Sequence, residues 1–181
     1  MSLLSDASVV DEILDEYRSA LGQAFTAYRN HCCRVLNFCL ALCEVENDDK
    51  ILQKVSIAVA FHDLGIWTAK TFDYLEPSKQ LVRDYLAQEN LTSWTAEIWA
   101  MIEFHHKLGV YSKHSTWLVE PFRKADWIDV SLGGLKFGLP VDFVAEVKHT
   151  FPNAGFHKRL TQLTWQQFKQ TPWNPLPMMR W

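Results

Sequence analysis

The chain has no proline before Pro77 and only one glycine, Gly22, before Gly65. Glycine and proline interrupt regular structure most strongly, and all-β folds need them in frequent turns. We therefore expect an all-α fold, with long helices in the first third of the chain. The 181 residues, of which 48% are hydrophobic and 22% charged, are enough for one domain with a sizeable core. This composition excludes a disordered chain.

Apolar residues recur at steps of three and four from Val10 to Cys39, which predicts an amphipathic helix with a break near Gly22. His31 falls on the inward face of this helix. The cysteines form no C-x-x-C pair, so core packing is favoured over a zinc site. They are Cys32, Cys33, Cys39 and Cys43.

An apolar helix is predicted over 51–61, with Gly65 as a stop signal and a loop over 66–76. Pro77 suits the first turn of the next helix, which extends to about Asn90. Further helices are predicted over about 92–107, 116–132, 140–150 and 153–170. The tail after Thr171 has three prolines and several large apolar side chains. We expect this tail to pack on the body or on a partner subunit.

The net charge is -3, and no basic tract indicates binding to a nucleic acid polymer. No run of 18 or more apolar residues predicts a membrane span, and no leader pattern opens the chain. We therefore expect a cytoplasmic protein that does not contact membranes and that is a possible homo-oligomer.

Imidazole and carboxylate groups lie on the inward faces or at the ends of four predicted helices. A buried group of either kind is costly unless it is paired or bound to a metal. Their nitrogen and oxygen donors suit a divalent ion such as Mn, Fe, Zn, Ni, Co or Mg. The residues are His31, the doublet His62-Asp63, the doublet His105-His106, and Asp126.

The order H…HD…D, with the doublet in AFHDLG and the last aspartate in KADWID, resembles the HD-domain superfamily of metal-dependent phosphohydrolases. The resemblance covers about residues 20–135. It implies one compact helical bundle over 1–181, with 136–181 packed on the HD-like core. It also implies one or two divalent ions and hydrolysis of a small phosphorylated metabolite, such as a nucleotide. The implied metal ligands are His31, His62, Asp63 and Asp126; Asp129 lies one turn later, and the Ala-Asp context favours Asp126.

The expected catalytic residues are Asp63, His105 and His106. Either histidine of the second doublet could donate a proton to the leaving alkoxide or serve a second metal. Phosphate oxygens need positive donors, for which the candidates are Lys70, Lys107, Lys113, Arg123 and His114. In the loop after the first doublet, Asp73 and Tyr74 are candidates for lining the pocket. The remaining histidines, His149 and His157, are expected at the surface, where His114 is also expected.

Two other functions stay open. Some HD relatives hold two irons and oxidise C–H bonds with oxygen, but no histidine lies between Asp63 and His105 to complete a six-ligand set. A domain that keeps the metal site as a nucleotide sensor or structural element is the second alternative. It is left open by Ile66, which stands four residues after His62 where several branches place an acidic or lysine side chain.

Overall fold

The first third of the chain is helical, as the scarcity of glycine and proline predicts. In the computed structural model, which describes residues 2–43 and 48–180, α1 spans Ser8–Glu16, α2 spans Arg18–Leu21 and α3 spans Phe25–Leu42. A 3-10 helix at Gly22–Ala24 joins α2 to α3. The predicted break at Gly22 is confirmed, since its φ of 51° is the left-handed conformation that favours glycine.

The cysteines of α3 and Cys43 just after it are all free thiols. Cys32, Cys33 and Cys39 are buried, and Cys43 is partly buried. These side chains pack among the apolar residues of the core, which confirms the interpretation from their spacing.

Helix α4 spans Asp49–Phe61. The Asp48 carboxylate caps it by accepting hydrogen bonds from two backbone N–H groups of the first turn, at 2.9 and 3.2 Å. The next long helix, α6, spans Leu75–Gln88 and begins two residues before Pro77. Proline is tolerated there because the first N–H groups of a helix have no partner within it.

Gly65 was expected to stop a helix, and the structure shows a different role. It begins a short helix, α5 (Gly65–Thr68), inside the segment predicted to be a loop. A Cβ atom at Gly65 would lie 2.6 Å from the carbonyl oxygen of Tyr74 and 3.0 Å from Cβ of Pro77. Only glycine therefore lets α5 lie this close to the start of α6, where Tyr74 is placed.

The second half contains a 3-10 helix and four α-helices. Three predicted helices were about three residues too long at one end: α7 ends at Phe104 instead of Lys107, α8 begins at Val119 instead of Thr116, and α10 begins at Phe156 instead of Asn153. The histidine doublet consequently lies just beyond the end of α7. The elements are the 3-10 helix Thr92–Trp94, α7 (Thr95–Phe104), α8 (Val119–Val130), α9 (Val141–Thr150) and α10 (Phe156–Gln170).

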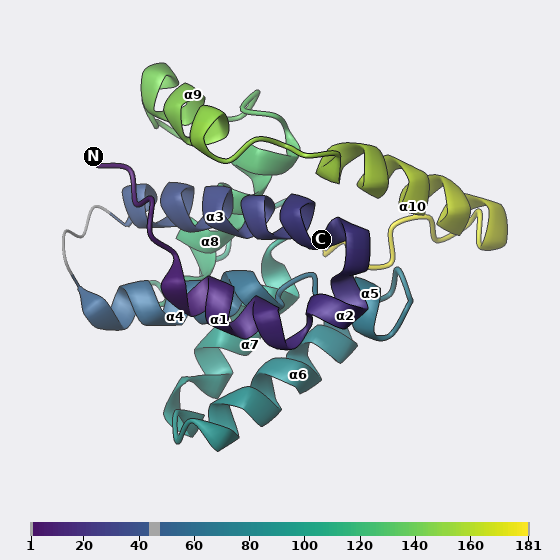
Figure 1. Ribbon diagram of the computed structural model, residues 1–181, viewed down its shortest axis with the longest axis horizontal. Helices are drawn as coiled ribbons and strands as arrows, with labels where there is room; N and C mark the ends of the chain where they lie inside the picture. Colours follow the sequence, from purple (N-terminus) through teal and green to yellow (C-terminus); the bar gives the residue numbers. More distant parts are fainter. Residues whose placement is uncertain (1, 44–47, 181) are drawn as a thin grey trace.

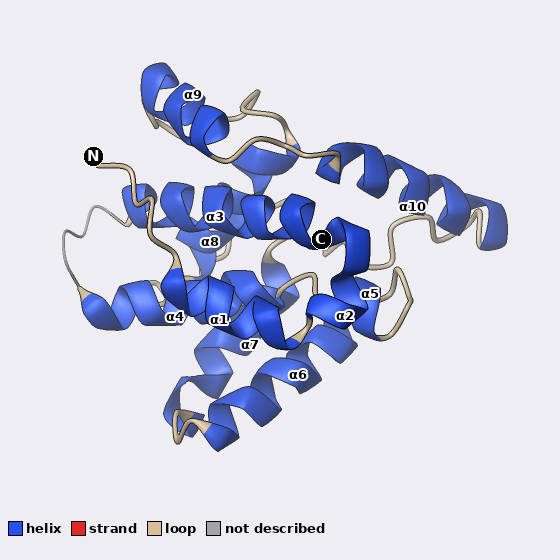
Figure 2. Cartoon of the chain, in the orientation of Figure 1, coloured by secondary structure: helices blue, strands red, loops and turns tan. Residues whose placement is uncertain are grey.

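Helix α3 runs through the middle of the molecule, and Figure 1 shows α4 and α1 on one side of it and α9 on the other. Its closest packing partners are α8 and α4. These three helices enclose the part of the core that carries the histidines and aspartates. Figure 2 shows an all-helical fold, and the residues described form no β-strand beyond an isolated bridge between Lys107 and Arg180. None of the helices described is long and apolar enough to cross a membrane.

The tail after α10 returns to the body, as expected from its apolar residues. The backbone N–H of Leu108 donates to the carbonyl of Arg180 at 3.0 Å. The guanidinium of Arg180 donates to Glu103 at 2.6 Å, and Met178 is buried. Trp173 and Leu176 are exceptions, because they remain 83% and 39% exposed.

Candidate metal centre

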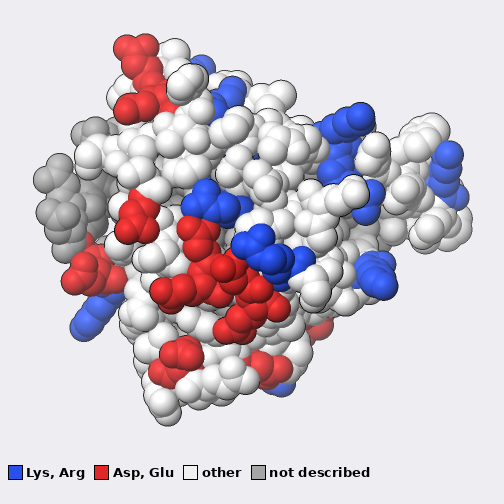
Figure 3. All heavy atoms as spheres, viewed as in Figure 1, with Lys and Arg blue, Asp and Glu red and all other residues white. Residues whose placement is uncertain are grey.

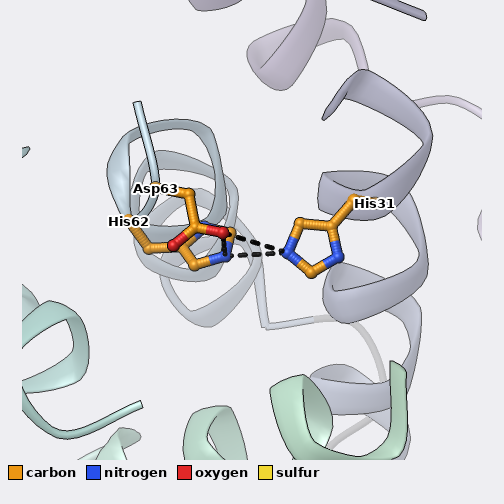
Figure 4. A group of neighbouring side chains, drawn as sticks. All are labelled: His31, His62 and Asp63. Carbon is orange, nitrogen blue, oxygen red and sulfur yellow. Dashed lines mark hydrogen bonds and ion pairs between the residues drawn. The ribbon is translucent and has the colours of Figure 1, made fainter. Parts of the chain in front are cut away.

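Four buried side chains from three regions of the chain meet beside α3. His31 projects from α3, His62 and Asp63 follow the end of α4, and Asp126 lies on α8. His31 Nε2 lies 2.9 Å from His62 Nε2 and 3.7 Å from both Asp63 Oδ2 and Asp126 Oδ1. Figure 4 shows His31 pointing across to the His62–Asp63 doublet. The structure therefore brings together all four ligands that the sequence predicts.

The rings of three histidines are held by oxygen acceptors on the side away from this centre. His62 Nδ1 donates to the Val59 carbonyl at 2.8 Å, and His105 Nδ1 donates to the Ile102 carbonyl at 2.7 Å. His31 Nδ1 donates to the Asp129 carboxylate at 2.7 Å. With Nδ1 used in these contacts, Nε2 of each ring is the nitrogen that faces inward, as it is in a metal ligand.

The contact between His31 Nε2 and His62 Nε2 needs a third participant. Two lone pairs cannot hydrogen-bond to each other, so a proton or a cation has to lie between the two nitrogens. His62 Nε2 is also 3.5 Å from Asp63 Oδ2 and 3.9 Å from Asp126 Oδ1. Ligand atoms about 2.1 Å from a metal lie about 3.0 Å apart in an octahedron and about 3.4 Å apart in a tetrahedron. The separations that involve the two histidines, from 2.9 to 3.9 Å, bracket the tetrahedral value.

The carboxylates favour a metal over a proton. Asp63 Oδ1 and both carboxylate oxygens of Asp126 are buried and accept no hydrogen bond of good geometry among the described residues. Their near neighbours are imidazoles of the same cluster: His105 Nε2 lies 3.4 Å from Asp63 Oδ1, and His106 Nδ1 lies 3.1 Å from Asp126 Oδ2. Buried carboxylate oxygens without partners are rare, because their desolvation is not compensated. Two imidazole nitrogens and two such carboxylates form a donor set that fits a divalent transition metal or Mg²⁺.

A second group of donor atoms shares Asp63 with the first. Ligand atoms of Asp63, His105 and His106 lie within 4.8 Å of one another. Asp63 Oδ2 faces His31 and His62, whereas its Oδ1 lies 3.4 Å from His105 Nε2. The Asp63 carboxylate thus stands between two groups of imidazoles, as a bridging ligand would.

His106 differs from the other histidines because its Nδ1 faces a carboxylate of the cluster itself and its Nε2 faces a hydroxyl. Nδ1 lies 3.1 Å from Asp126 Oδ2, and Nε2 lies 2.9 Å from the hydroxyl of Tyr74. Its side chain is 13% exposed, more than those of His31, His62, Asp63, His105 or Asp126. His106 is therefore the member of the cluster nearest to solvent.

The surroundings push the pKa values of two histidines in opposite directions. Burial lowers the pKa of the His62 imidazole, which keeps it neutral. Burial alone would also lower the pKa of His106, but the adjacent Asp126 carboxylate raises it above its ordinary value. Burial raises the pKa of Tyr74 well above its ordinary value, so its hydroxyl stays protonated.

Asp129 and Arg34 complete the site, and the sequence interpretation missed both roles. Arg34 Nε and Nη2 donate to the Asp129 carboxylate at 2.5 and 2.8 Å, and that carboxylate orients His31. His157, expected at the surface, is instead partly buried, with Nε2 2.9 Å from the Asp129 carbonyl oxygen. The signal was present in the sequence: His31 and Arg34 lie one turn apart, as do Asp126 and Asp129.

The predicted phosphate-binding cations lie outside this cluster. Within the described residues, Lys70, Lys113 and Arg123 form no ion pair with Asp63 or Asp126. Arg123 is buried and binds Glu120 with two nitrogens, at 2.7 and 2.8 Å. Arg123 Nη1 also donates to the carbonyl oxygen of Lys107 at 3.1 Å, and Lys107 directly follows the His105-His106 doublet in the chain.

A hollow of about 380 Å³ lies between the end of α3 and the start of α8. Its walls include Tyr111, Trp117 and Lys124, together with His114, which stacks on Trp117 with ring centroids 4.0 Å apart. None of the cluster residues lines it, so the hollow is separate from the candidate metal centre.

Comparison of the chain with protein-family models, with curated proteins and with solved structures finds no match in any of the three. The description of the site therefore depends on its own geometry.

Proposed function

We propose that this chain is an HD-type helical protein that hydrolyses a phosphoester with the help of one or two divalent metal ions. His31, His62, Asp63 and Asp126 would hold the first ion. The observation that carries the proposal is the convergence of two inward Nε2 atoms and two buried carboxylates whose ion-pair neighbours are all imidazoles of the same cluster. The substrate would be a small phosphorylated metabolite such as a nucleotide.

A divalent ion supplies two things to such a reaction: it polarises a phosphoryl oxygen and lowers the pKa of a bound water. The protein residues prepare the site for it. The Val59 carbonyl and the Asp129 carboxylate fix the tautomers of His62 and His31, so that neither ring has to turn. The surrounding apolar core excludes bulk water and strengthens the electrostatic interactions inside the site.

Proton donation to the leaving oxygen falls to His106. It is the cluster histidine most exposed to solvent, and Asp126 favours its protonated form. The Tyr74 hydroxyl, 2.9 Å from His106 Nε2, orients the ring toward the open side. Lys107, next to His106 in the chain, would meet the phosphate, with Lys70, Lys113 and Arg123 as further candidates.

The shared position of Asp63 favours a site for two ions, which keeps the di-iron oxygenase in consideration. Metal analysis separates the two activities. Two irons per chain together with oxygen consumption would support the oxygenase, whereas turnover of phosphoesters without oxygen supports the hydrolase.

The test combines elemental analysis of the purified protein with a panel of phosphomonoesters and phosphodiesters. We expect bound divalent metal and hydrolysis of at least one phosphoester in the wild type, and neither in Asp63→Asn. The matched control is Asp142→Asn, an exposed carboxylate on α9, which should keep both. A protein that binds no metal, or an Asp63→Asn variant with full metal content and full activity, would overturn the proposal. Bound metal without turnover of any phosphoester would instead support the sensor.

A further inference from the structure

The C-terminal part of the chain carries charge of one sign. Residues 147–181 contain no Asp or Glu and five basic residues, although the whole chain has a net charge of -3. Residues 1–146 therefore carry a net charge of -8. Such segregation of charge creates complementary surfaces on a single chain.

Helix α10 lies in the basic part and covers little of the core. Figure 1 shows that it extends beyond the rest of the body, and Phe156 is its only buried residue. On its outward side, Trp165 is 57% and Phe168 44% exposed, with their rings stacked at 5.8 Å. Lys158 and Lys169 flank this pair, since they lie one to two turns away on the same side of the helix. We name these four residues the α10 face.

Two adjacent exposed aromatic rings between lysines form a contiguous apolar surface with a polar rim, which is a feature of interaction sites. The lysines indicate that the partner surface is acidic.

An acidic surface is present on α1 and α6 of the same molecule. Glu12, Glu16, Asp84 and Glu89 are exposed there and surround the partly buried Tyr17 and Tyr85. We name these four carboxylates the acidic face. Arg18 and Arg29 are already paired with Asp15 and Asp11. Arg83 lies 3.6 Å from Asp84 of the acidic face, so most of the negative charge of this face comes from Glu12, Glu16 and Glu89.

Figure 3 shows acidic side chains gathered over α1 and basic side chains over both halves of α10, on the same side of the molecule. A two-fold axis between two such surfaces places each one on its counterpart in a second copy. This is the self-complementary arrangement of a symmetric dimer.

We propose that the α10 face binds the acidic face of a second copy of this chain, so that two identical contacts close a symmetric dimer. Trp165 and Phe168 pack against the exposed parts of Tyr17 and Tyr85 in the partner. Lys158 and Lys169 lie opposite the carboxylates of the partner's α1 and α6. This inference does not depend on the proposed hydrolase activity, because none of its residues belongs to the metal centre.

Light scattering on purified full-length protein tests the dimer, at concentrations between about 1 and 100 μM. We expect a mass of twice 21.0 kDa in the wild type. Two charge-reversal variants, Lys158→Glu/Lys169→Glu and Glu12→Lys/Glu16→Lys, should each be monomeric, with unchanged circular dichroism. Mixed in equal amounts, they should form a heterodimer, because each reversed surface then meets its complement. Lys50→Glu/Lys136→Glu, which changes as many charges elsewhere, should remain dimeric.

A wild type that is monomeric throughout this range would overturn the proposal, as would two reversal variants that remain monomeric after mixing. Persistence of the dimer in both variants separately would place the interface elsewhere and also contradict it. A monomer that sediments with phosphatidylserine vesicles would assign the α10 face to an anionic membrane instead.

Discussion

The two residues that follow α4 resemble those that follow α7 at the first position and differ at the second. Each apolar helix is followed by an imidazole, His62 or His105, whose Nδ1 donates to the carbonyl three residues earlier. The next residue differs: Asp63 has a buried carboxylate oxygen that accepts no hydrogen bond of good geometry, whereas His106 has a partner close to each of its nitrogens. Similar local sequence therefore produces one residue suited to binding a cation and another suited to handling a proton.

This difference follows from the side chains of other helices and loops that surround Asp63 and His106. Asp63 faces inward toward His31 and His105, which supply nitrogens, so a cation satisfies all of them. His106 faces Asp126 and Tyr74, which already supply oxygen partners. We therefore expect a substitution of Asp63 to weaken metal binding, and a substitution of His106 to lower turnover while the metal stays bound.

Asp63→Asn should have the largest effect. It removes the charge shared by both groups of donors, so the affinity for metal should fall by more than the roughly 10–100-fold typical of losing an outer partner. Activity should be lost with it. Calorimetric titration of metal-free protein with Mn²⁺ or Zn²⁺ measures the affinity, and retention of wild-type affinity would remove Asp63 from the ligand set.

His106→Gln should have the opposite effect at the other helix end, because it should impair turnover without loss of metal. The metal content should stay at the wild-type level, while kcat falls about 10²–10⁴-fold through loss of the proton donor. The paired measurement is metal content by elemental analysis and kcat on the best substrate from the panel. If this variant also lost its metal, His106 would be a ligand, and the proposed division between the two helix ends would be wrong.

Asp129→Asn tests the orientation of His31. The amide can no longer hold His31 Nδ1–H as a charged acceptor, so metal affinity should fall about 10–100-fold. Circular dichroism should show an intact fold, since Arg34 keeps its contacts with the carbonyls of Phe151 and Pro152. An unchanged affinity would show that Asp129 serves the packing of α3 on α8 alone.

Tyr74→Phe should have the smallest effect of the four. It removes one hydroxyl from His106 Nε2, which corresponds to about a 2- to 10-fold decrease in kcat for a hydrogen bond of ordinary strength. Metal affinity should not change. The pH profile of kcat is the informative readout, because a shift of the limb assigned to His106 distinguishes orientation of that ring from a packing defect.

The local parts of this architecture could be predicted from sequence. The apolar spacing predicted the inward face of His31, and the order H…HD…D predicted which four side chains lie together as candidate ligands. Helix boundaries were less accurate, because they depend on neighbours distant in sequence. Gly65 begins α5 since the backbone of Tyr74 leaves no room for a Cβ, and that contact is not visible in the local sequence.

The long-range partners could not be predicted in the same way. Asp129 lies 98 residues from His31 and 95 residues from Arg34, and only the packing of α3 against α8 brings them together. The one-turn spacing of His31 with Arg34 and of Asp126 with Asp129 shows that each pair shares a helix face. It does not show that these two faces meet.

The most direct test is anomalous diffraction from a crystal of the wild-type protein grown with Mn²⁺. The account predicts a peak about 2.0–2.3 Å from His31 Nε2, His62 Nε2 and the carboxylates of Asp63 and Asp126. A second ion, if bound, should lie between Asp63 and His105. No peak at His31 and His62, with a proton holding the two nitrogens together at saturating Mn²⁺, would contradict the central claim that this cluster is a metal centre.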